Sequence, residues 1–503
     1  MRKILLPSSQ HPDPSLQASW NYAQLGLLIF PFIPILGALG IFLALVGTWK
    51  QKYRPIIRRP LNWGFALLSV ILIISAAFAF NRAEAFLGLA NLFPFFLLFA
   101  AYSQLIQTPN QLRRLAWILV IPSVPVVILG FGQIFLGWAT PAQLQGIVGW
   151  ALEPKGNPPG RMASVFMYAN ILAAYLQIVF ILSLGLWIEE TKRQKHLTPS
   201  PSPLAERGAG AEGGGRFLVP SLRLGMPTVR LQPHLSFSFL RNWGRRSLQN
   251  VHSQSETLNE GKKRDSYWLR WVFLSVAVIG NAIALILTNS RNAWAIVIVS
   301  CLAFALYQGW RWLIALVAGV ATTVLWAAFG PSPVREWLRI IVPTYFWERL
   351  TDHRYPDRPI ALLRTTQWKF AWSMTQQRPW TGWGLRNFTP LYEAKMQIWL
   401  GHPHSLLLML TAETGIPATI LFFGLVGWVM SQGILLLAKM HFTALPQNKL
   451  IIFSYLVAFG CCTLFNTVDV TLFDLRVNTL GWLLLAAICG VVYKKKAIAY
   501  HLN

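Results

Sequence analysis

A few ionisable side chains border long apolar runs of this sequence, and they are the residues best suited to chemistry. They come from separate stretches of the chain, namely Arg161, Arg291, His402 with His404, and Asp469 with Asp474. Ionisable groups at membrane depth are energetically costly, so each of these residues is a functional candidate. For either arginine taken singly, a residue that snorkels to the membrane interface is an equally good explanation.

The combination of arginines with histidine favours a reaction in which a phosphate group leaves. Arginine guanidinium groups bind pyrophosphate without needing Mg²⁺. A neutral histidine beside them can take a proton from an attacking hydroxyl group. His402 and His404 have no histidine partner at i, i+4 spacing and no cysteine cluster, so we expect neither a metal site nor a cofactor. These residue types predict glycosyl transfer from a lipid-linked pyrophosphate sugar at a membrane surface.

The local sequence around His404 predicts how this side chain is positioned. Pro403 suits the first position of a helix, and Gly415 followed by Pro417 suits its end, so we expect a short helix over 403–413. His404 would then lie in the first turn, where the helix dipole disfavours imidazolium and keeps the ring neutral as a base. The same helix end favours a nearby phosphate oxygen. A histidine with a purely structural capping role is the alternative.

The elements that must position these residues are membrane-spanning helices. Hydrophobic residues make up 54% of the chain and charged residues only 12%, whereas about a quarter of a soluble chain is charged. The composition and the apolar runs predict an all-α polytopic membrane protein with about 11 or 12 transmembrane helices. The runs are 24–48, 62–80, 85–106, 116–138, 163–188, 268–287, 292–309, 311–330, 416–438, 450–467 and 477–493. The first run, interrupted by prolines and glycines, is either one span or two short helices, which leaves the orientation of the N-terminus open.

The distribution of basic residues predicts which side of the membrane each loop occupies. The net charge of +26 does not indicate nucleic-acid binding, because Lys and Arg lie between apolar runs rather than along one soluble face. Alternate loops that are rich in Lys and Arg should be cytoplasmic in a multi-pass protein of the plasma (inner) membrane, in contact with its lipids. The candidate residues fall in the other set of loops, so we expect all of them on the outer side.

The chain divides into five predicted regions. They are N-terminal transmembrane helices over 1–188, a disordered low-complexity cytoplasmic insertion over 189–266, central transmembrane helices over 267–330, a loop with the histidine motif over 331–415, and C-terminal transmembrane helices over 416–503. Apolar residues at i, i+3, i+4, i+7 spacing in 331–350, from Val334 to Ile341, and a similar pattern in 358–377 predict a large outer loop of amphipathic helices on the membrane surface.

At the candidate residues the sequence resembles the O-antigen ligase and O-antigen polymerase family of bacterial membrane glycosyltransferases. The similar stretches are 161–176, 287–294, 378–388 and 402–417, with weaker similarity from Asn466 onward. The region that resembles the family covers about 275–480, and the order of the motifs and the membrane topology are similar over a longer part of the chain. The sequence departs from the family pattern at three places. Ser405 stands where Asn is usual, Asn292 stands where Gly is common, and Tyr168-Ala169 replaces the Asn-Pro that usually precedes Asn170.

The resemblance implies the substrates and the roles of the site residues. It implies a polyprenyl-pyrophosphate-linked glycan donor and an acceptor hydroxyl on a glycan or a lipid-linked molecule. His404 would be the catalytic base, and Arg161 and Arg291 would bind the pyrophosphate. Arg386 and Glu413 are further candidates for substrate binding. Ligase and polymerase differ in acceptor rather than in donor chemistry, so both remain open.

Two other functions compete with glycosyl transfer. The stretches 170–176 and 378–382 also resemble cyanobacterial family members linked to inorganic-carbon uptake, which makes a bicarbonate transporter or transport-associated protein the main alternative. A transporter should have ionisable residues or broken helices at the midplane, and the apolar runs here are nearly free of charge. A structural partner of an envelope assembly is the third possibility, and it would not require the arginines and His404 to converge.

Overall fold

The computed structural model describes residues 10–197, 267–351, 359–440 and 446–502, and the regular elements in those ranges are helices. Within this described part, 11 helices are long and apolar enough to cross a membrane, as predicted. These spans are Pro34–Ile57, Pro60–Ala77, Arg82–Leu105, Pro109–Phe135, Ala169–Gln194, Tyr267–Leu287, Arg291–Gln308, Arg311–Phe329, Ile416–Lys439, Gln447–Val468 and Leu475–Lys495. The predicted apolar runs overlap with them along the whole chain.

The first predicted run, 24–48, is divided between two helices. Helix α2 (Gln17–Ile29) ends just before Pro31, and α3 (Pro34–Ile57) begins with a proline at its first position. A proline suits this position because the first turn of a helix leaves its N–H groups unpaired. The two helices approach so closely that a Cβ on Gly26 would lie 2.8 Å from the carbonyl oxygen of Gly37. The run is thus divided between a helix of 13 residues and one of 24 residues, and the second, which is not short, is long enough to cross a membrane.

The described residues fall into two compact units, of which one holds 188–197 and 267–273 and the other holds the rest. In the first unit, the described residues include an ion-pair cluster in which Arg193 bonds to Glu189 at 2.6 Å and Arg270 lies 3.8 Å from Glu190. Helix α10 (Ala169–Leu197) continues past residue 188, so the segment that follows it starts later than predicted. Residues 198–266, which hold most of the predicted insertion, lie outside the described residues.

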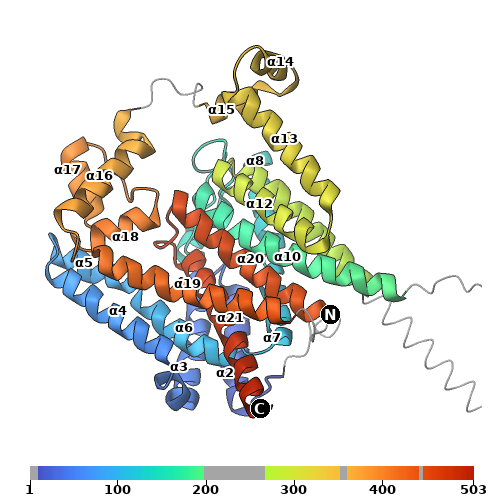
Figure 1. Cartoon of the computed structure of the whole chain (residues 1–503), viewed down its shortest axis with the longest axis vertical. Helices are drawn as coiled ribbons and strands as arrows, with labels where there is room; N and C mark the ends of the chain where they lie inside the picture. Colours follow the sequence, from blue (N-terminus) through green and yellow to red (C-terminus); the bar gives the residue numbers. More distant parts are fainter. Residues whose placement is uncertain (1–9, 198–266, 352–358, 441–445, 503) are drawn as a thin grey trace, which may run out of the picture. The chain divides into compact units, whose positions relative to one another are not determined.

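The second unit has a core between the second and third spans and the last spans of the sequence. Helix α21 (Leu475–Leu502) packs against α6 (Phe93–Leu105), α19 (Ile416–Lys439) and α20 (Pro446–Val468) (Figure 1). Phe65 of α4 (Pro60–Ala77) lies with Phe96 and Phe99 around the indole ring of Trp482. Because α20 and α21 are joined by the short segment 469–474, this packing fixes the place of Asp469 and Asp474 at one end of the spans.

The long segment between α13 (Arg311–Phe329) and α18 (Leu406–Thr414) holds helices of two kinds. Helix α14 (Val334–Ile341) packs against α13, as does α15 (Thr344–Leu350), and α14 leaves Trp337, Ile340 and Ile341 more than 70% exposed, as expected for an amphipathic surface helix. Helix α16 (Arg364–Gln377) instead buries Phe370 and Met374 together with α17 (Phe388–Met396) and α18 (Figure 1). Residues 352–358, which include the start of the second predicted helix, lie outside the described residues.

The side of α16 that holds Phe370 and Met374 is therefore covered by protein, whereas Ile360 and Trp372 of the predicted apolar face are 74% and 48% exposed. The same i, i+3, i+4 spacing arises in both cases, so the pattern identifies an apolar face without saying what covers it. This small helical core supports the loop that carries the two histidines.

Candidate functional site

A cavity of about 850 Å³ lies where the loops between the spans meet. Its wall is formed by residues from five separate stretches, within 81–84, 168–171, 386–393, 399–404 and 469–474. His404, Arg386, Asp469 and Asp474, which were singled out from the sequence, all line this cavity. The cavity therefore brings together residues that are far apart along the chain.

His404 lies in the loop before α18 rather than in the helix. The helix begins at Leu406 after an extended Ser405, and His404 has a φ of +53°, in the left-handed region that a right-handed helix excludes. The prediction that His404 occupies the first turn is therefore wrong, although the helix does end before Gly415 as expected. The indole N–H of Trp368 donates to the carbonyl oxygen of Pro403 at 3.0 Å and ties the loop to α16.

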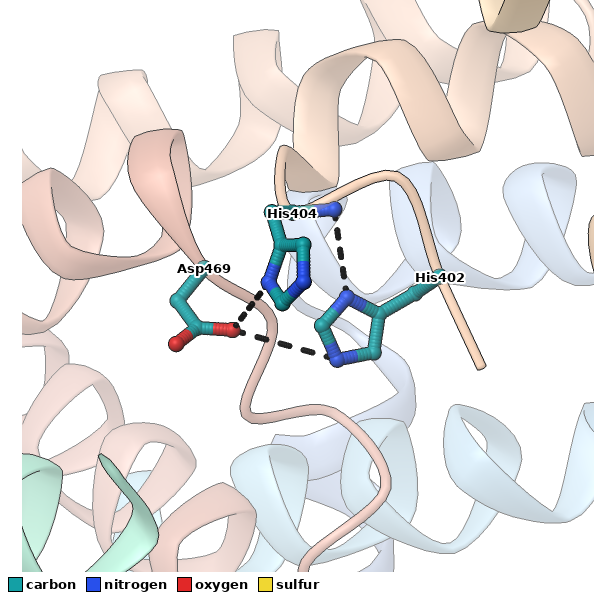
Figure 2. Close-up of side chains that lie close together, drawn as sticks. All are labelled: His402, His404 and Asp469. Atoms are coloured by element: carbon teal, nitrogen blue, oxygen red, sulfur yellow. Dashed lines mark hydrogen bonds and ion pairs between the residues drawn. The ribbon is translucent and has the colours of Figure 1, made fainter. Parts of the chain in front are cut away.

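The imidazole of His404 is paired with the carboxylate of Asp469 (Figure 2). Nδ1 of His404 lies 3.1 Å from Oδ1 of Asp469, whose side chain is almost fully buried. Burial raises the pKa of a carboxyl group, but hydrogen bonds from His404 and the Val470 N–H and the charges of the histidines outweigh it, so the pKa of Asp469 lies below its ordinary value. An ionised Asp469 holds the proton on Nδ1 and leaves Nε2 as the nitrogen that can accept a proton.

His402 supports this pair from the other side. Its Nδ1 accepts a hydrogen bond from the backbone N–H of His404 at 3.2 Å, and its ring lies parallel to that of Phe473. Burial, helped by the nearby His404 and Arg364, lowers the pKa of His402 to about 4 although Asp469 acts in the opposite direction. His402 is therefore neutral at physiological pH and fixes the backbone of His404.

The same three residues have the spacing of metal ligands, which the sequence did not suggest. One ligand atom each from His402, His404 and Asp469 lies within 4.8 Å of the others. The protonation of His402 fits this role poorly, because a neutral ring that accepts at Nδ1 carries its proton on Nε2, the nitrogen 3.8 Å from Asp469. The hydrogen bonds thus favour an aspartate–histidine pair over a metal centre at this position.

Arg161 is connected to the histidine pair through Asn170. The Asn170 amide donates to Oδ2 of Asp469 at 2.8 Å, and its carbonyl oxygen accepts from the guanidinium of Arg161. The guanidinium also donates from Nε to the carbonyl oxygen of Thr288 at 2.8 Å. Arg161 is not among the residues that line the cavity, but a continuous series of hydrogen bonds joins it to His404.

Arg291 lies beside this site, in a different cavity. It is the first residue of α12 (Arg291–Gln308) and lines an almost wholly apolar cavity of about 970 Å³ between α12, α13 and α15. The side-chain amide of Asn292 is 3.5 Å from the carbonyl oxygen of Val468, next to Asp469. The predicted convergence is therefore partial, because Arg291 adjoins the site of His404 without sharing its cavity.

Arg386 and Glu413 have different surroundings. Arg386 has a φ of +65°, and its Nε lies 3.1 Å from Glu84 on the wall of the His404 cavity. Glu413 is 2% exposed, and its carboxylate accepts a hydrogen bond from the Phe388 N–H at 3.0 Å. Burial raises the pKa of Glu413 to about 7, although the backbone N–H groups of Phe388 and Arg386 and the charge of Arg386 act in the opposite direction. Its carbonyl oxygen also accepts from the Gly384 N–H at 2.7 Å, so Glu413 holds the turn that presents Arg386 rather than lining the cavity.

The roles of two site residues, Asn170 and His402, were not predicted from the sequence. Asn170 lies in a stretch that resembled the family, but nothing in its spacing indicates a bond to Asp469. His402 was treated only as a neighbour of His404, because the hydrogen bond between the two residues depends on the left-handed backbone of His404. Both roles follow from contacts between elements that are distant in sequence.

Comparison with known proteins identifies part of this assembly. The model of the O-antigen ligase family matches residues 275–423, a range that contains Arg291, Arg386, His404 and Glu413 but not Arg161 or Asp469. No curated protein matches the chain significantly. The chain is thus a multi-pass membrane protein that carries an O-antigen ligase family domain at residues 275–423.

Proposed function

We propose that the protein is a metal-independent glycosyltransferase of the O-antigen ligase or polymerase type. It transfers a glycan from a polyprenyl-pyrophosphate lipid to an acceptor hydroxyl group at the outer face of the plasma membrane. The observation that carries this proposal is the His404–Asp469 pair on the wall of a large cavity, in a chain with an O-antigen ligase family domain. An ordered base beside a cavity is what activation of an acceptor hydroxyl requires.

In this reaction His404 acts as the general base. The acceptor oxygen attacks the anomeric carbon of the donor glycan, and the bond from that carbon to the pyrophosphate oxygen breaks. The polyprenyl pyrophosphate leaves with the electron pair, while Nε2 of His404 takes the proton of the acceptor hydroxyl. Asp469 stabilises the resulting imidazolium through Nδ1, at the 3.1 Å separation already present.

The cavity that contains Arg291 supports a place for the donor lipid. Its apolar walls suit a polyprenyl chain, and Arg291 at the start of α12 supplies a positive charge for the pyrophosphate. Arg161 bonds to the carbonyl oxygen of Thr288, three positions before Arg291, so both arginines border the same turn. The donor's anionic group would then lie at this turn, with its glycan extending toward His404 and its lipid chain in the membrane.

Transfer in isolated membranes tests the proposal. His404→Ala should lower the transfer rate by about 10²- to 10⁴-fold at an unchanged protein level, because the base is lost. Arg161→Ala and Arg291→Ala should weaken use of the donor, while Arg311→Ala, at the opposite end of the α12–α13 pair, serves as a control for loss of a positive charge. Undiminished transfer by the His404 variant would disprove the mechanism, and bicarbonate flux in proteoliposomes without any transfer would support the transporter instead.

A further inference from the structure

The cavity beside His404 has exposed aromatic side chains that the proposed mechanism does not use. Trp399 is 68% exposed, Phe473 42% and Tyr168 41%, and all three line the cavity. Large aromatic faces left open among polar groups are typical of binding sites. The negative face of an aromatic ring suits the C–H groups of a sugar ring, which carry a small positive charge. The cavity thus offers surfaces on which pyranose rings can stack.

The charges on the cavity wall complement these aromatic surfaces. Among its lining residues are four carboxylates, from Glu84, Glu393, Asp469 and Asp474, and a single guanidinium, from Arg386. That guanidinium pairs with Glu84 at 3.1 Å, and the guanidinium of Arg476 behind the wall pairs with Asp474 at 3.4 Å, so two carboxylates, those of Glu393 and Asp469, exceed these two guanidinium groups. Carboxylates and the amides of Asn81 and Asn170 bond readily to sugar hydroxyl groups, whereas a negatively charged ligand would be repelled.

The two cavities therefore differ in the charge that they accept. The apolar cavity has Arg291 at one end and suits an anionic lipid, while the cavity of His404 has excess negative charge. A base must touch the acceptor hydroxyl, so the acceptor has to enter the cavity of His404.

We propose that the cavity of His404 binds an uncharged glycan as the acceptor and discriminates against phosphorylated or uronic-acid acceptors. Trp399 stacks on a sugar ring, and the carboxylates bind neutral hydroxyl groups and repel anions. The assignment of this glycan as the acceptor rests on the proposed function, whereas its binding to the cavity does not. A cationic ligand would also be attracted by the carboxylates and by the aromatic faces, so binding of neutral probes is the observation that separates the two kinds of ligand.

Direct binding to the purified full-length protein in detergent tests this inference. The probes are the neutral tetrasaccharides of galactose, glucose and mannose, and the tetramers of the corresponding uronic acids. Saturation-transfer NMR at low salt measures the binding of each probe. At least one neutral probe should bind, and its uronic counterpart should bind at least about tenfold more weakly, with a difference that narrows as salt screens the charges.

Matched variants identify the cavity as the place of binding. Trp399→Ala should weaken the neutral probe by about tenfold, whereas Trp337→Ala, which removes an equally exposed indole on α14, should have no effect. Glu393→Gln should improve binding of the uronic probe by about threefold, and Glu336→Gln on α14 should not.

Three results would overturn the inference. They are no binding of any neutral probe at millimolar concentration, equal or tighter binding of the uronic probes at low salt, and an unchanged affinity in the Trp399 variant. Arg291→Ala separates this inference from the proposed function, because it should weaken transfer through the donor but leave probe binding to the cavity of His404 intact. If Trp399→Ala lost probe binding but retained the transfer rate, only the assignment of the glycan as the acceptor would be contradicted.

Discussion

Nδ1 of His404 lies 3.1 Å from Oδ1 of Asp469, although the two residues are 65 positions apart in the sequence. The histidine belongs to the loop that precedes α18, and the aspartate follows the last residue of α20. Packing of α20 and α21 against the other spans therefore decides whether the pair can form. The relationship makes Asp469 a residue whose charge should be tested separately from its size.

Replacement of Asp469 by asparagine should lower the transfer rate by about 10²- to 10⁴-fold. The amide keeps the size of the side chain but cannot stabilise an imidazolium or hold the proton on Nδ1. The loss should fall on kcat more than on KM, which steady-state transfer kinetics would measure. Asp13→Asn makes the same chemical change at a distant helix cap and should leave the rate unaltered. An Asp469→Asn rate within a factor of about two of the native rate would exclude the pair from catalysis.

Replacement of Asn170 by alanine should shift the pH dependence of transfer. Asn170 donates to Oδ2 of Asp469, which favours the ionised carboxylate, so its loss should move the pKa of Asp469 upward toward the ordinary value. The part of the acidic limb of the pH–rate profile that reflects protonation of Asp469 should therefore move to higher pH.

Asn281→Ala is the matched control for Asn170→Ala. Asn170 is partly buried, whereas Asn281 is buried and donates to the Ser123 hydroxyl, at a site that does not contribute to the His404 cavity. A change that is equal in both variants, or a lower rate with an unshifted profile, would indicate that Asn170 has a purely structural role.

Much of the membrane architecture could be predicted because each span needs about 20 apolar residues, a signal contained in the local sequence. Pro31 and Pro34 likewise indicated the break that separates α2 from α3, and Gly415 indicated the end of α18. The start of α18 was missed because the left-handed backbone of His404 depends on contacts with Asp469 and Trp368. Local sequence preferences therefore predicted a helix end where the end depends on one element alone, and failed where it depends on contacts with other elements.

The site itself was only partly predictable. Alternation of loops assigns residues to one side of the membrane, but it cannot say which of them share a cavity. Arg291 thus borders the apolar cavity, while Arg386 borders that of His404. The metal-like spacing of His402 and His404 with Asp469 also depends on the packing of α20, which i, i+4 spacing arguments do not consider.

Replacement of Glu413 by glutamine should alter the pH dependence of stability. Burial raises the pKa of Glu413 from 4.5 to about 7, so the folded state prefers the protonated carboxyl. Its stabilising contribution is complete below pH 4.5 and is lost as the pH rises through about 7, a change of up to about 3 kcal/mol at 1.36 kcal/mol per unit. The variant should therefore gain thermal stability relative to the native protein between pH 5 and pH 8.

Thermal unfolding followed by tryptophan fluorescence at several pH values would measure this gain. Glu336→Gln on α14 makes the same change at an exposed position and serves as the matched control. A constant difference for the Glu413 variant would contradict the raised pKa.

Replacement of His402 separates support of the backbone from metal binding. His402→Asn retains an acceptor near the His404 N–H, so it should keep most of the transfer rate, whereas His402→Ala should lose about tenfold because the His404 backbone is no longer fixed. Transfer by the native protein should also be unchanged by a strong chelator, since the arginines and the Asp469–His404 pair carry the chemistry. If His402, His404 and Asp469 instead held a metal ion, His402→Asn would be as inactive as His402→Ala and the chelator would abolish transfer. Measurement of transfer rates with and without chelator in these two variants therefore decides between the two functions of the cluster.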